Sequence, residues 1–301
     1  MVAFNPERDI TDLSGKVILV TGGNNGLGKE TIIQLAKHNP SKIYMASRSE
    51  ERANTAIAEI TKTVPRANII FLPLDLASLA SVRKAADIFL SSNNQLDILV
   101  NNAGVMTTEP GLTKDGYEVN FGTNHMGPAL LTKLLLPVLQ STRAGGSDVR
   151  IVNLSSALYQ AAPKPGILFA QNKTPLADLS TLARYGQSKL ANAYFTTSFA
   201  KRYPKIKSVA IHPGVVRTSL TDVTKGSSFF LSLLVRVSNL MSVTIEEGAW
   251  NQLWASTASS VVNGAFYFPV GKETHAKVLD DKKQAEALWE WTEAELKAHG
   301  Y

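Results

Sequence analysis

The chain of 301 residues contains no cysteine, so disulfide bonds, thiolate catalysis and cysteine-ligated metal sites are all excluded. It also lacks a run of about 18 apolar residues, the length that a membrane-spanning helix requires. The first residues show no basic-then-apolar signal pattern. Histidine is scarce, and no metal-binding spacing such as H-E-x-x-H occurs, so we expect no metal site. These absences favour a reducing compartment, and we expect a cytoplasmic location without an integral membrane span.

The sequence also lacks clustered positive charge. The chain has 31 Lys and Arg residues against 25 Asp and Glu residues, a formal net charge of +6, but no basic run of five or more. Because nucleic-acid binding normally leaves a clustered basic patch, we expect no nucleic-acid partner. Part of the positive charge can instead meet an anionic small molecule. Apolar residues make up 44% of the chain, which is enough for a real core.

Short apolar runs alternate with helical patterns along the chain. Strands are predicted at residues 16–20, 42–46, 68–72, 96–100, 149–154, 207–211 and 265–268. Helices are predicted at 27–38, 50–63, 78–91, from about 113 to 141, at 183–202 and at 284–299. Such alternation predicts an α/β fold, a single Rossmann-like domain over residues 1–301 with a doubly wound parallel sheet and helices on both faces. Residues 158–182 lack a clear period, and long loops in compact domains are often functional.

A glycine-rich turn, T-G-G-N-N-G-L-G, follows the first predicted strand and opens the first helix. Glycine lets the backbone approach a pyrophosphate without an intervening Cβ, and the helix N-terminus offers free N–H groups. The alternative is a tight turn with no ligand, but the strand–turn–helix context favours a dinucleotide site. The candidate cofactor-binding residues here are Gly22, Asn24, Asn25, Gly26, Leu27 and Gly28.

Further motifs follow in order. N-N-A-G comes after the fourth strand, Y-G-Q-S-K lies on a later helix, and H-P-G-V-V-R-T follows the sixth strand. Together with the glycine turn they resemble the short-chain dehydrogenase/reductase family, over residues 13 to about 270. The motif N-H-M-G and the long separation between Ser156 and Tyr185 resemble its retinol-dehydrogenase-like branch. The resemblance implies an oxidoreductase that moves a hydride between a nicotinamide cofactor and a carbonyl or alcohol.

Tyr185 and Lys189 are four residues apart, which places them on one face of a helix. A nearby ammonium favours the phenolate, so we expect Lys189 to lower the tyrosine pKa from its ordinary value of about 10. The resemblance implies that Tyr185 is the proton donor or base and that Lys189 also binds the nicotinamide ribose. It further implies that Ser156 hydrogen-bonds the reacting oxygen and that Asn124 holds a water linking Lys189 to solvent. Each has a local alternative: a surface Tyr–Lys pair, a capping serine, and a polar residue at a helix kink.

The end of the second strand, Ser47-Arg48, carries no acidic residue that would select NAD. The Arg48 guanidinium can instead form forked, charged hydrogen bonds with a 2′-phosphate, so we predict NADP(H) as the cofactor. Against this, many NADP-preferring relatives carry a base in the glycine turn where this chain has Asn25. The resemblance adds further cofactor-binding residues around the adenine, the central strands and the nicotinamide: Asp75, Leu76, Asn102, Ala103, Gly104, Pro213, Gly214, Val216 and Thr218.

The residues expected to bind the substrate have the weakest sequence pattern. The resemblance implies a cofactor-binding half at residues 13–156, a pocket loop at 157–182 and a lid at 219–245. Apolar residues of the lid, such as Phe229, Phe230 and Leu231, favour a lipophilic small molecule, a carbonyl or an alcohol, although they can equally serve only to pack the lid. Other readings stay open: a catalytically silent NADP(H)-binding regulatory protein, a dehydratase or epimerase, and a membrane-surface enzyme. A homodimer through the helices bearing Asn124 and Tyr185 is possible.

Overall fold

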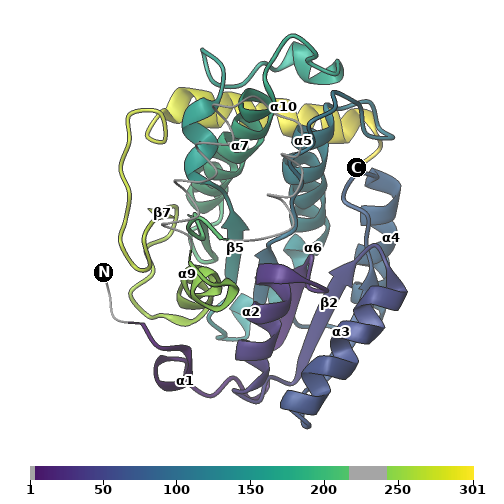
Figure 1. Cartoon of the computed structure of the whole chain (residues 1–301), viewed down its shortest axis with the longest axis vertical. Helices are drawn as coiled ribbons and strands as arrows, with labels where there is room; N and C mark the ends of the chain where they lie inside the picture. Colours follow the sequence, from purple (N-terminus) through teal and green to yellow (C-terminus); the bar gives the residue numbers. More distant parts are fainter. Residues whose placement is uncertain (1–3, 217–242) are drawn as a thin grey trace.

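Seven parallel strands form one sheet in the computed structural model, which describes residues 4–216 and 243–301 (Figure 1). The strands are β1 (Val17–Thr21), β2 (Lys42–Ser47), β3 (Ile69–Pro73), β4 (Ile98–Asn101), β5 (Arg150–Leu154), β6 (Lys207–Ile211) and β7 (Phe266–Tyr267). Their order across the sheet is β3-β2-β1-β4-β5-β6-β7. The chain runs outward from β1 in one direction and from β4 in the other, so the predicted doubly wound sheet is confirmed. Ligands of such sheets bind at the carboxyl ends of the strands where the order reverses.

Helices cover both faces of the sheet. One face packs on α4 (Leu79–Ser92), α6 (Gly127–Ala144) and α7 (Thr181–Arg202). The other packs on α2 (Gly26–Ala36), α3 (Glu50–Thr63) and α9 (Ile245–Thr257). The C-terminal helix α10 (Lys282–Ala298) lies outside α7 as a further layer, drawn in yellow in Figure 1.

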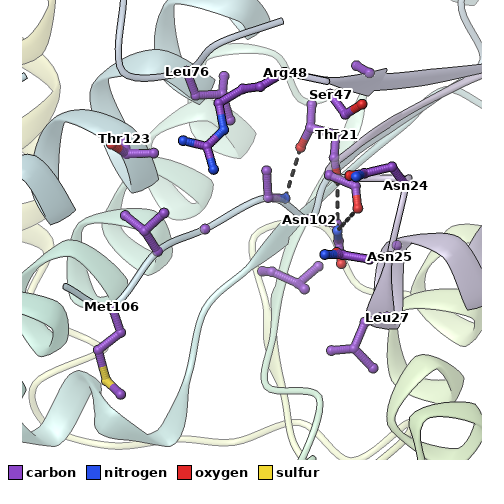
Figure 2. Close-up of a pocket in the computed structure, with 18 of the residues that line it drawn as sticks. Thr21, Asn24, Asn25, Leu27, Ser47, Arg48, Leu76, Asn102, Met106 and Thr123 are labelled. Carbon is purple, nitrogen blue, oxygen red and sulfur yellow. Dashed lines mark hydrogen bonds between the residues drawn. The ribbon is translucent and has the colours of Figure 1, made fainter. Parts of the chain in front are cut away.

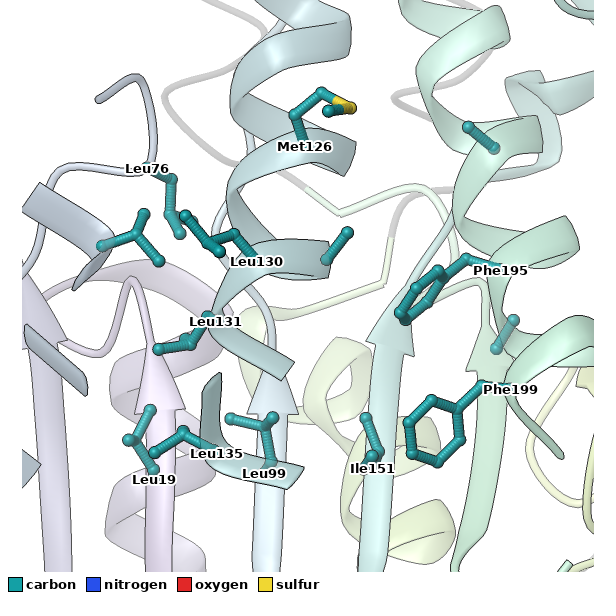
Figure 3. Packing of buried hydrophobic residues seen from close by; sticks show 14 of the residues in the cluster. Leu19, Leu76, Leu99, Met126, Leu130, Leu131, Leu135, Ile151, Phe195 and Phe199 are labelled. Carbon is teal, nitrogen blue, oxygen red and sulfur yellow. The ribbon is translucent and has the colours of Figure 1, made fainter. Parts of the chain in front are cut away.

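The packing of the core explains why the strands can be predicted from the sequence. Figure 3 shows Leu99 and Ile151 of the sheet facing Leu135 of α6 and Phe199 of α7, all of them fully or almost fully buried. Strands β1, β4 and β5 are buried at every position. Parallel strands buried on both faces appear in a sequence as continuous apolar runs, which is the pattern found here.

The long helix expected from about 113 to 141 is wrong in its first part. Residues 113–118 form a turn, followed by the short α5 (Val119–Phe121), a π-helical segment η1 (Gly122–Met126) and then α6. The π turn occurs where backbones approach closely: a Cβ on Gly127 would lie 2.4 Å from the carbonyl oxygen of Leu76. The polar residue Asn124 therefore lies in a helical irregularity of the kind that often marks a functional site.

Other segments also differ from expectation. Residues 158–182 contain much of the 3₁₀ helix η2 (Ala157–Ala161) and all of η3 (Ala170–Lys173), and η2 packs against α7. Neither the short α1 (Pro6–Asp9) nor α9 was predicted. Helix α9 begins with a capping box between Thr244 and Glu247, which is a readable start signal. Within the described part of the chain, no helix combines the length and apolar character needed to cross a bilayer.

Candidate active site

A cavity of about 920 Å³ opens at the carboxyl ends of the strands, spanning the point where the strand order reverses (Figure 2). Most of the predicted cofactor residues line it: Gly22, Asn24, Asn25, Gly26, Leu27, Gly28, Ser47, Arg48, Asp75, Leu76, Asn102, Ala103, Gly104, Tyr185, Lys189 and Pro213. Residues that lie in six separate stretches of the sequence thus share one cavity. Its size suits a ligand larger than a simple metabolite.

The glycine turn is fixed tightly against the loop after β4. Asn102 Nδ2 donates to the carbonyl oxygen of Thr21 at 2.8 Å, and the Ala103 amide donates to Thr21 Oγ1 at 3.0 Å (Figure 2). A Cβ on Gly28 would lie 2.4 Å from the carbonyl oxygen of Gly22, so only glycine fits there. Gly26, with φ +50°, has open space where a Cβ would stand. The turn is therefore held tightly on the side of Asn102 and Ala103 and has open space at Gly26, as a phosphate-binding loop requires.

Two arginines face the cavity at the end of β2. Arg48 reaches from the strand end toward the middle of the cavity (Figure 2), and Arg52, on the first turn of α3, lines the same region. Neither side chain has an ion-pair partner within the described residues. The buried Ser47 hydroxyl also lacks a partner there. An unsatisfied hydroxyl beside two unpaired guanidinium groups fits an anionic, hydrogen-bonding group such as a phosphorylated ribose.

Asp75 combines a cavity position with a local role. Its Oδ1 accepts a hydrogen bond from the Ala77 amide at 3.1 Å, and its own amide donates to Ser81 Oγ at 3.0 Å. The carboxylate thus stabilises the turn before α4. Both Asp75 and Leu76 still line the cavity, so the local role does not exclude a ligand contact.

Tyr185 and Lys189 lie on the cavity side of α7. The Lys189 side chain is buried, and its Nζ donates to the carbonyl oxygen of Leu154 at 3.0 Å. Nζ stands 5.5 Å from the centroid of the Tyr185 ring. The Ser155 hydroxyl donates to the Lys189 carbonyl oxygen at 2.6 Å and ties this turn of α7 to the end of β5. The predicted pairing of Tyr185 and Lys189 is therefore present in space.

The expected effect of Lys189 on the tyrosine is wrong for this structure. Burial raises the pKa of Tyr185 to about 12, although a hydrogen bond with the Ser156 side chain lowers it in part. Burial likewise lowers the pKa of Lys189 to about 8. Desolvation disfavours the charged form of each group, and it is the largest cause of both shifts. Tyr185 consequently carries its proton at neutral pH.

The other two predicted catalytic residues, Asn124 and Ser156, are not among the residues that line the described cavity. The Asn124 amide is engaged with the backbone of Val105: Oδ1 accepts from its amide at 2.7 Å and Nδ2 donates to its carbonyl at 2.9 Å. Asn124 Oδ1 and Lys189 Nζ both lie close to Gly104, within 3.2 Å of where a Cβ would stand. Ser156 Oγ accepts from the Leu158 amide at 3.2 Å, so this hydroxyl also caps η2. The four candidate residues nevertheless converge on one end of the cavity.

The segment after β6 is described only in part. Pro213 lines the cavity, whereas Val216 packs toward Gly248 of α9, and Gly214 adopts φ +93°. Thr218 and the apolar residues expected in the lid lie outside the described residues. None of residues 157–182 lines the described cavity; η2 and Asn172 instead pack around α7 and the turn at Glu118.

Sequence reasoning missed several cavity residues. Arg52 was identifiable, since it lies four residues beyond Arg48 at the start of a helix. Thr123 and residues 106–109 carry no local signal, because only the close approach of the π-helical segment and the loop after β4 brings them to the cavity.

The two histidines near these motifs, His125 and His212, have local packing and hydrogen-bonding roles. His125 Nε2 pairs with Thr292 Oγ1 at 2.9 Å, and His212 packs against Phe268. Burial lowers the pKa of His125 to about 3 and that of His212 to about 4. Among the described residues, no group of three or more acidic or histidine side chains is placed to bind a metal ion.

The strand order, the glycine turn and the cavity at the reversal point define a dinucleotide-binding protein of the Rossmann type. The chain belongs to the short-chain dehydrogenase/reductase family: residues 16–227 match the family model described as short chain dehydrogenase. It is 40% identical over 294 residues to an uncharacterised oxidoreductase of Schizosaccharomyces pombe, covering 95% of this chain and 86% of that protein. It is 34% identical over 292 residues to human retinol dehydrogenase 12, covering 94% and 86% respectively. These relatives support the retinol-dehydrogenase-like branch.

Solved structures agree on the fold. The crystal structure of an uncharacterised protein from Mycobacterium paratuberculosis superposes with a TM-score of 0.76 at 27% identity, covering 98% of this chain and 97% of that one. A gluconate 5-dehydrogenase from Burkholderia cenocepacia, solved in complex with NADP and tartrate, superposes with a TM-score of 0.67 at 23% identity, covering 86% and 95%. The family uses nicotinamide cofactors, and the chain is thus an oxidoreductase of this family.

Proposed function

We propose that the protein is an NADP(H)-dependent oxidoreductase acting on a carbonyl or alcohol group of a lipophilic small molecule, with Tyr185 as general acid or base. One observation carries the proposal: Tyr185 and Lys189 line the same cavity as the glycine turn, with the ammonium 5.5 Å from the phenol ring centroid. A proton-transferring group and a dinucleotide cradle in one cavity suit hydride transfer coupled to proton transfer.

The cofactor and four side chains have separate roles in the reaction. When bound, the cofactor supplies a hydride to the carbonyl carbon in the reductive direction, or accepts one in the reverse. Ser156 and Tyr185 hydrogen-bond the carbonyl oxygen as negative charge grows there, and Tyr185 delivers the proton that completes the alcohol. The raised pKa of Tyr185, about 12, keeps the phenol protonated at neutral pH, which is the state a donor needs. Lys189, adjacent to the ring, restores the proton and binds the ribose, and Asn124 holds the loop after β4 beside it.

The preference for NADP(H) rests on charge. Arg48 and Arg52 offer two guanidinium groups at the end of β2, and no carboxylate from that strand end lines the described cavity. A 2′-phosphate matches this environment, whereas a ribose diol would leave both cations without an anionic partner. The complex of the Burkholderia relative with NADP is consistent with this choice.

The substrate side of the molecule is apolar in sequence. Residues 13–156 form most of the cofactor half, and residues 219–245 supply the substrate side with its apolar lid residues, whereas residues 157–182 do not line the described cavity and instead pack around α7. The similarity to a protein named retinol dehydrogenase 12 supports an apolar alcohol or carbonyl. A cytoplasmic location agrees with the absence of cysteine.

The test follows NADPH absorbance with a panel of lipophilic ketones, aldehydes and quinones, using wild type and Tyr185→Phe. We expect turnover by the wild type and a loss of at least about a hundredfold in the variant, because general acid catalysis contributes about 10²–10⁴. Calorimetric titration should give the two proteins the same NADPH affinity. NADPH binding without turnover by the wild type across the panel would favour a regulatory cofactor-binding protein instead.

A further inference from the structure

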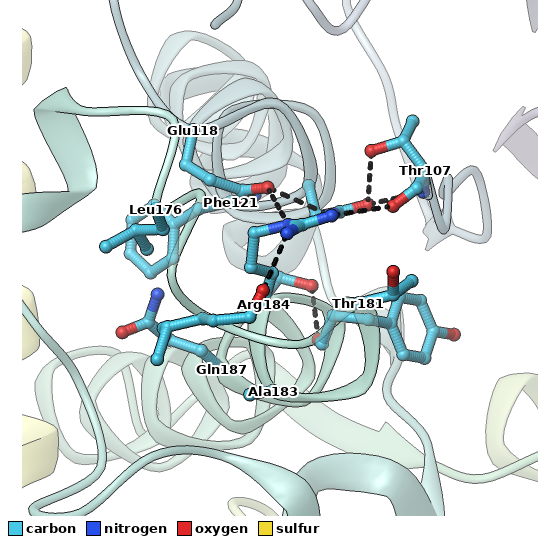
Figure 4. A network of polar contacts seen from close by, with 12 residues as sticks. Thr107, Glu118, Phe121, Leu176, Thr181, Ala183, Arg184 and Gln187 are labelled. Atoms are coloured by element: carbon cyan, nitrogen blue, oxygen red, sulfur yellow. Dashed lines mark hydrogen bonds and ion pairs between the residues drawn. The ribbon is translucent and has the colours of Figure 1, made fainter. Parts of the chain in front are cut away.

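A fully buried arginine precedes the catalytic tyrosine. Arg184 lies in the first turns of α7, and its side chain is only 2% exposed. Its guanidinium nitrogens donate to three carbonyl oxygens: Leu179 at 2.8 Å, Thr108 at 2.6 Å and, more weakly, Thr107 at 3.4 Å (Figure 4). Burying a cation is costly unless such partners compensate it.

The anionic partner is equally buried. Glu118 is 0% exposed, and its Oε1 stands 3.6 Å from Arg184 Nε. The carboxylate also accepts hydrogen bonds from the Phe121 amide at 2.7 Å and from Asn120 Nδ2 at 2.9 Å. Asn120 Oδ1 in turn accepts from the Thr107 amide at 2.9 Å. These contacts form a closed polar network, here named the Arg184 clasp (Figure 4). It consists of Arg184, Glu118, Asn120 and the backbone of residues 107–108.

The clasp joins three elements that meet at the reaction centre. Arg184 belongs to the helix that carries Tyr185, and Glu118 begins the segment that leads to Asn124. The third element is the loop after β4, of which residues 105–109 line the cavity. Asn124 holds this loop at Val105, and the clasp holds it at residues 107 and 108. Met106, between the two attachments, projects into the cavity (Figure 2).

We propose that Arg184 is a positioning residue that fixes the cavity wall formed by residues 106–109 at a set distance from Tyr185, and so determines which substrates can present their oxygen to that tyrosine. The proposal rests on the proposed function. An arginine suits the task because its planar fork donates to carbonyls of two elements at once, whereas a lysine ammonium is a point charge without that fork. The simpler alternative is an ion pair that only stabilises the fold.

Arg150 offers a matched control. It is also buried, donates to the carbonyl oxygens of Ala255 at 3.1 Å and Ala258 at 2.7 Å, and pairs with a carboxylate, Asp148, at 2.6 Å. It stands at the start of β5, at the opposite end of that strand from Ser155 and the cavity. Arg150→Lys therefore removes the same kind of bonds from the same molecule without touching the clasp.

The first experiment does not need turnover. Hydrogen–deuterium exchange is measured on the cofactor-free full-length wild type, Arg184→Lys and Arg150→Lys. We expect the amides of residues 105–109 to exchange roughly tenfold faster or more in Arg184→Lys alone, because local opening needs fewer bonds broken. Unchanged exchange of this loop would overturn the proposal. If Arg184→Lys does not fold, Glu118→Gln, which keeps an acceptor but removes the charge, is measured by the same criterion.

The second experiment separates positioning from stability. With NADPH saturating, we expect Arg184→Lys to lower kcat/KM roughly tenfold or more and to change the ratio between a small and a bulky ketone, since small displacements at a reaction centre are costly. NADPH affinity should stay within about twofold, as the glycine turn is untouched. An equal fall for both ketones, matched by Arg150→Lys, would make Arg184 merely structural. If the wild type turns over no substrate, the proposed function fails while the exchange experiment still decides on the clasp.

Discussion

At the scale of single residues, Tyr185 and Lys189 each occupy surroundings that disfavour their charged forms. Lys189 has no carboxylate partner among the described residues, and Nζ donates there to one carbonyl oxygen, that of Leu154. Such a site trades stability for function: a buried, easily deprotonated ammonium beside a phenol is useful for proton transfer but costly to fold. That trade can be measured.

We predict that Lys189→Met raises the stability of the cofactor-free protein at pH 7 while abolishing turnover. The folded-state pKa of about 8 lies below the ordinary value of 10.5, so below pH 8 the folded protein bears the full cost of the charge. As pH rises from 8 to 10.5 the folded protein loses this proton first, and the cost disappears. The variant should gain about 1–3 kcal/mol at pH 7, allowing for the lost hydrogen bond.

Thermal denaturation of both proteins at pH 7 and pH 10 checks this. The melting temperature of the variant should exceed that of the wild type by several degrees at pH 7, and the difference should shrink at pH 10. Tyr185 is present in both proteins, so its own titration above pH 10 cancels. A variant that melts below the wild type at pH 7 would show that the ammonium stabilises the fold.

The second residue-scale prediction concerns cofactor choice. Arg48→Ala should weaken NADPH binding by about 10–100-fold and NADH binding by less than about threefold, because only NADPH carries the 2′-phosphate and charged hydrogen bonds contribute about 1.5–3 kcal/mol. Calorimetric titration with both cofactors measures this. Arg83→Ala, at an exposed arginine paired with Asp87 on α4, is the control and should change neither affinity. Equal losses for both cofactors in Arg48→Ala would exclude the 2′-phosphate role.

At the scale of elements, the sequence predicts what depends on neighbours along the chain. The central strands lie within two residues of their predicted ends, and α3 coincides with residues 50–63, because buried parallel strands and amphipathic helices leave local patterns. The π-helical segment at Asn124 leaves no local pattern, since the close contact of Gly127 with Leu76 that accompanies it joins residues 51 positions apart. The sequence shows that the polar residue Asn124 interrupts an apolar helical pattern, but it does not show that Asn124 lies in a π-helical segment.

The same distinction applies to the site. Most of the predicted cofactor residues, with Tyr185 and Lys189, line one cavity, because the ends of parallel strands meet at one edge of the sheet. Asn124, Ser156, Gly214 and Val216 are not among its lining residues. The clasp of Arg184 with Glu118, sixty-six positions apart in sequence, has no local signature, and each residue alone reads as a solvated helix charge. The sequence could not predict that the pKa of Tyr185 is raised rather than lowered, because desolvation depends on the packed surroundings and not on the spacing to Lys189.

At the scale of the whole molecule, α10 decides which surfaces are available to a second copy. It covers the helices that bear Asn124 and Tyr185: Trp289 stacks on Phe195 of α7 with centroids 5.3 Å apart, and Glu293 pairs with Lys133 of α6 at 2.7 Å. Ser198 of α7 also donates to the carbonyl oxygen of Ala285 at 2.8 Å. A homodimer through these faces of α6 and α7 would first have to displace the C-terminal helix, with its buried aromatic contacts and ion pairs.

We therefore predict a monomer. Light scattering coupled to size-exclusion chromatography should give a mass near 32.6 kDa over a wide range of protein concentrations. Weakening the cover with Trp289→Ala exposes the apolar faces of Phe195 and Phe199 that the indole contacts, so this variant should self-associate as its concentration rises. Arg143→Ala, at a partly exposed residue near the end of α6 that bonds to Lys205 and Ser147 rather than to α10, is the control and should stay monomeric. A wild-type mass of twice the monomer would show that a surface other than the covered one supports dimerisation, because α10 and a partner cannot occupy the same faces of α6 and α7.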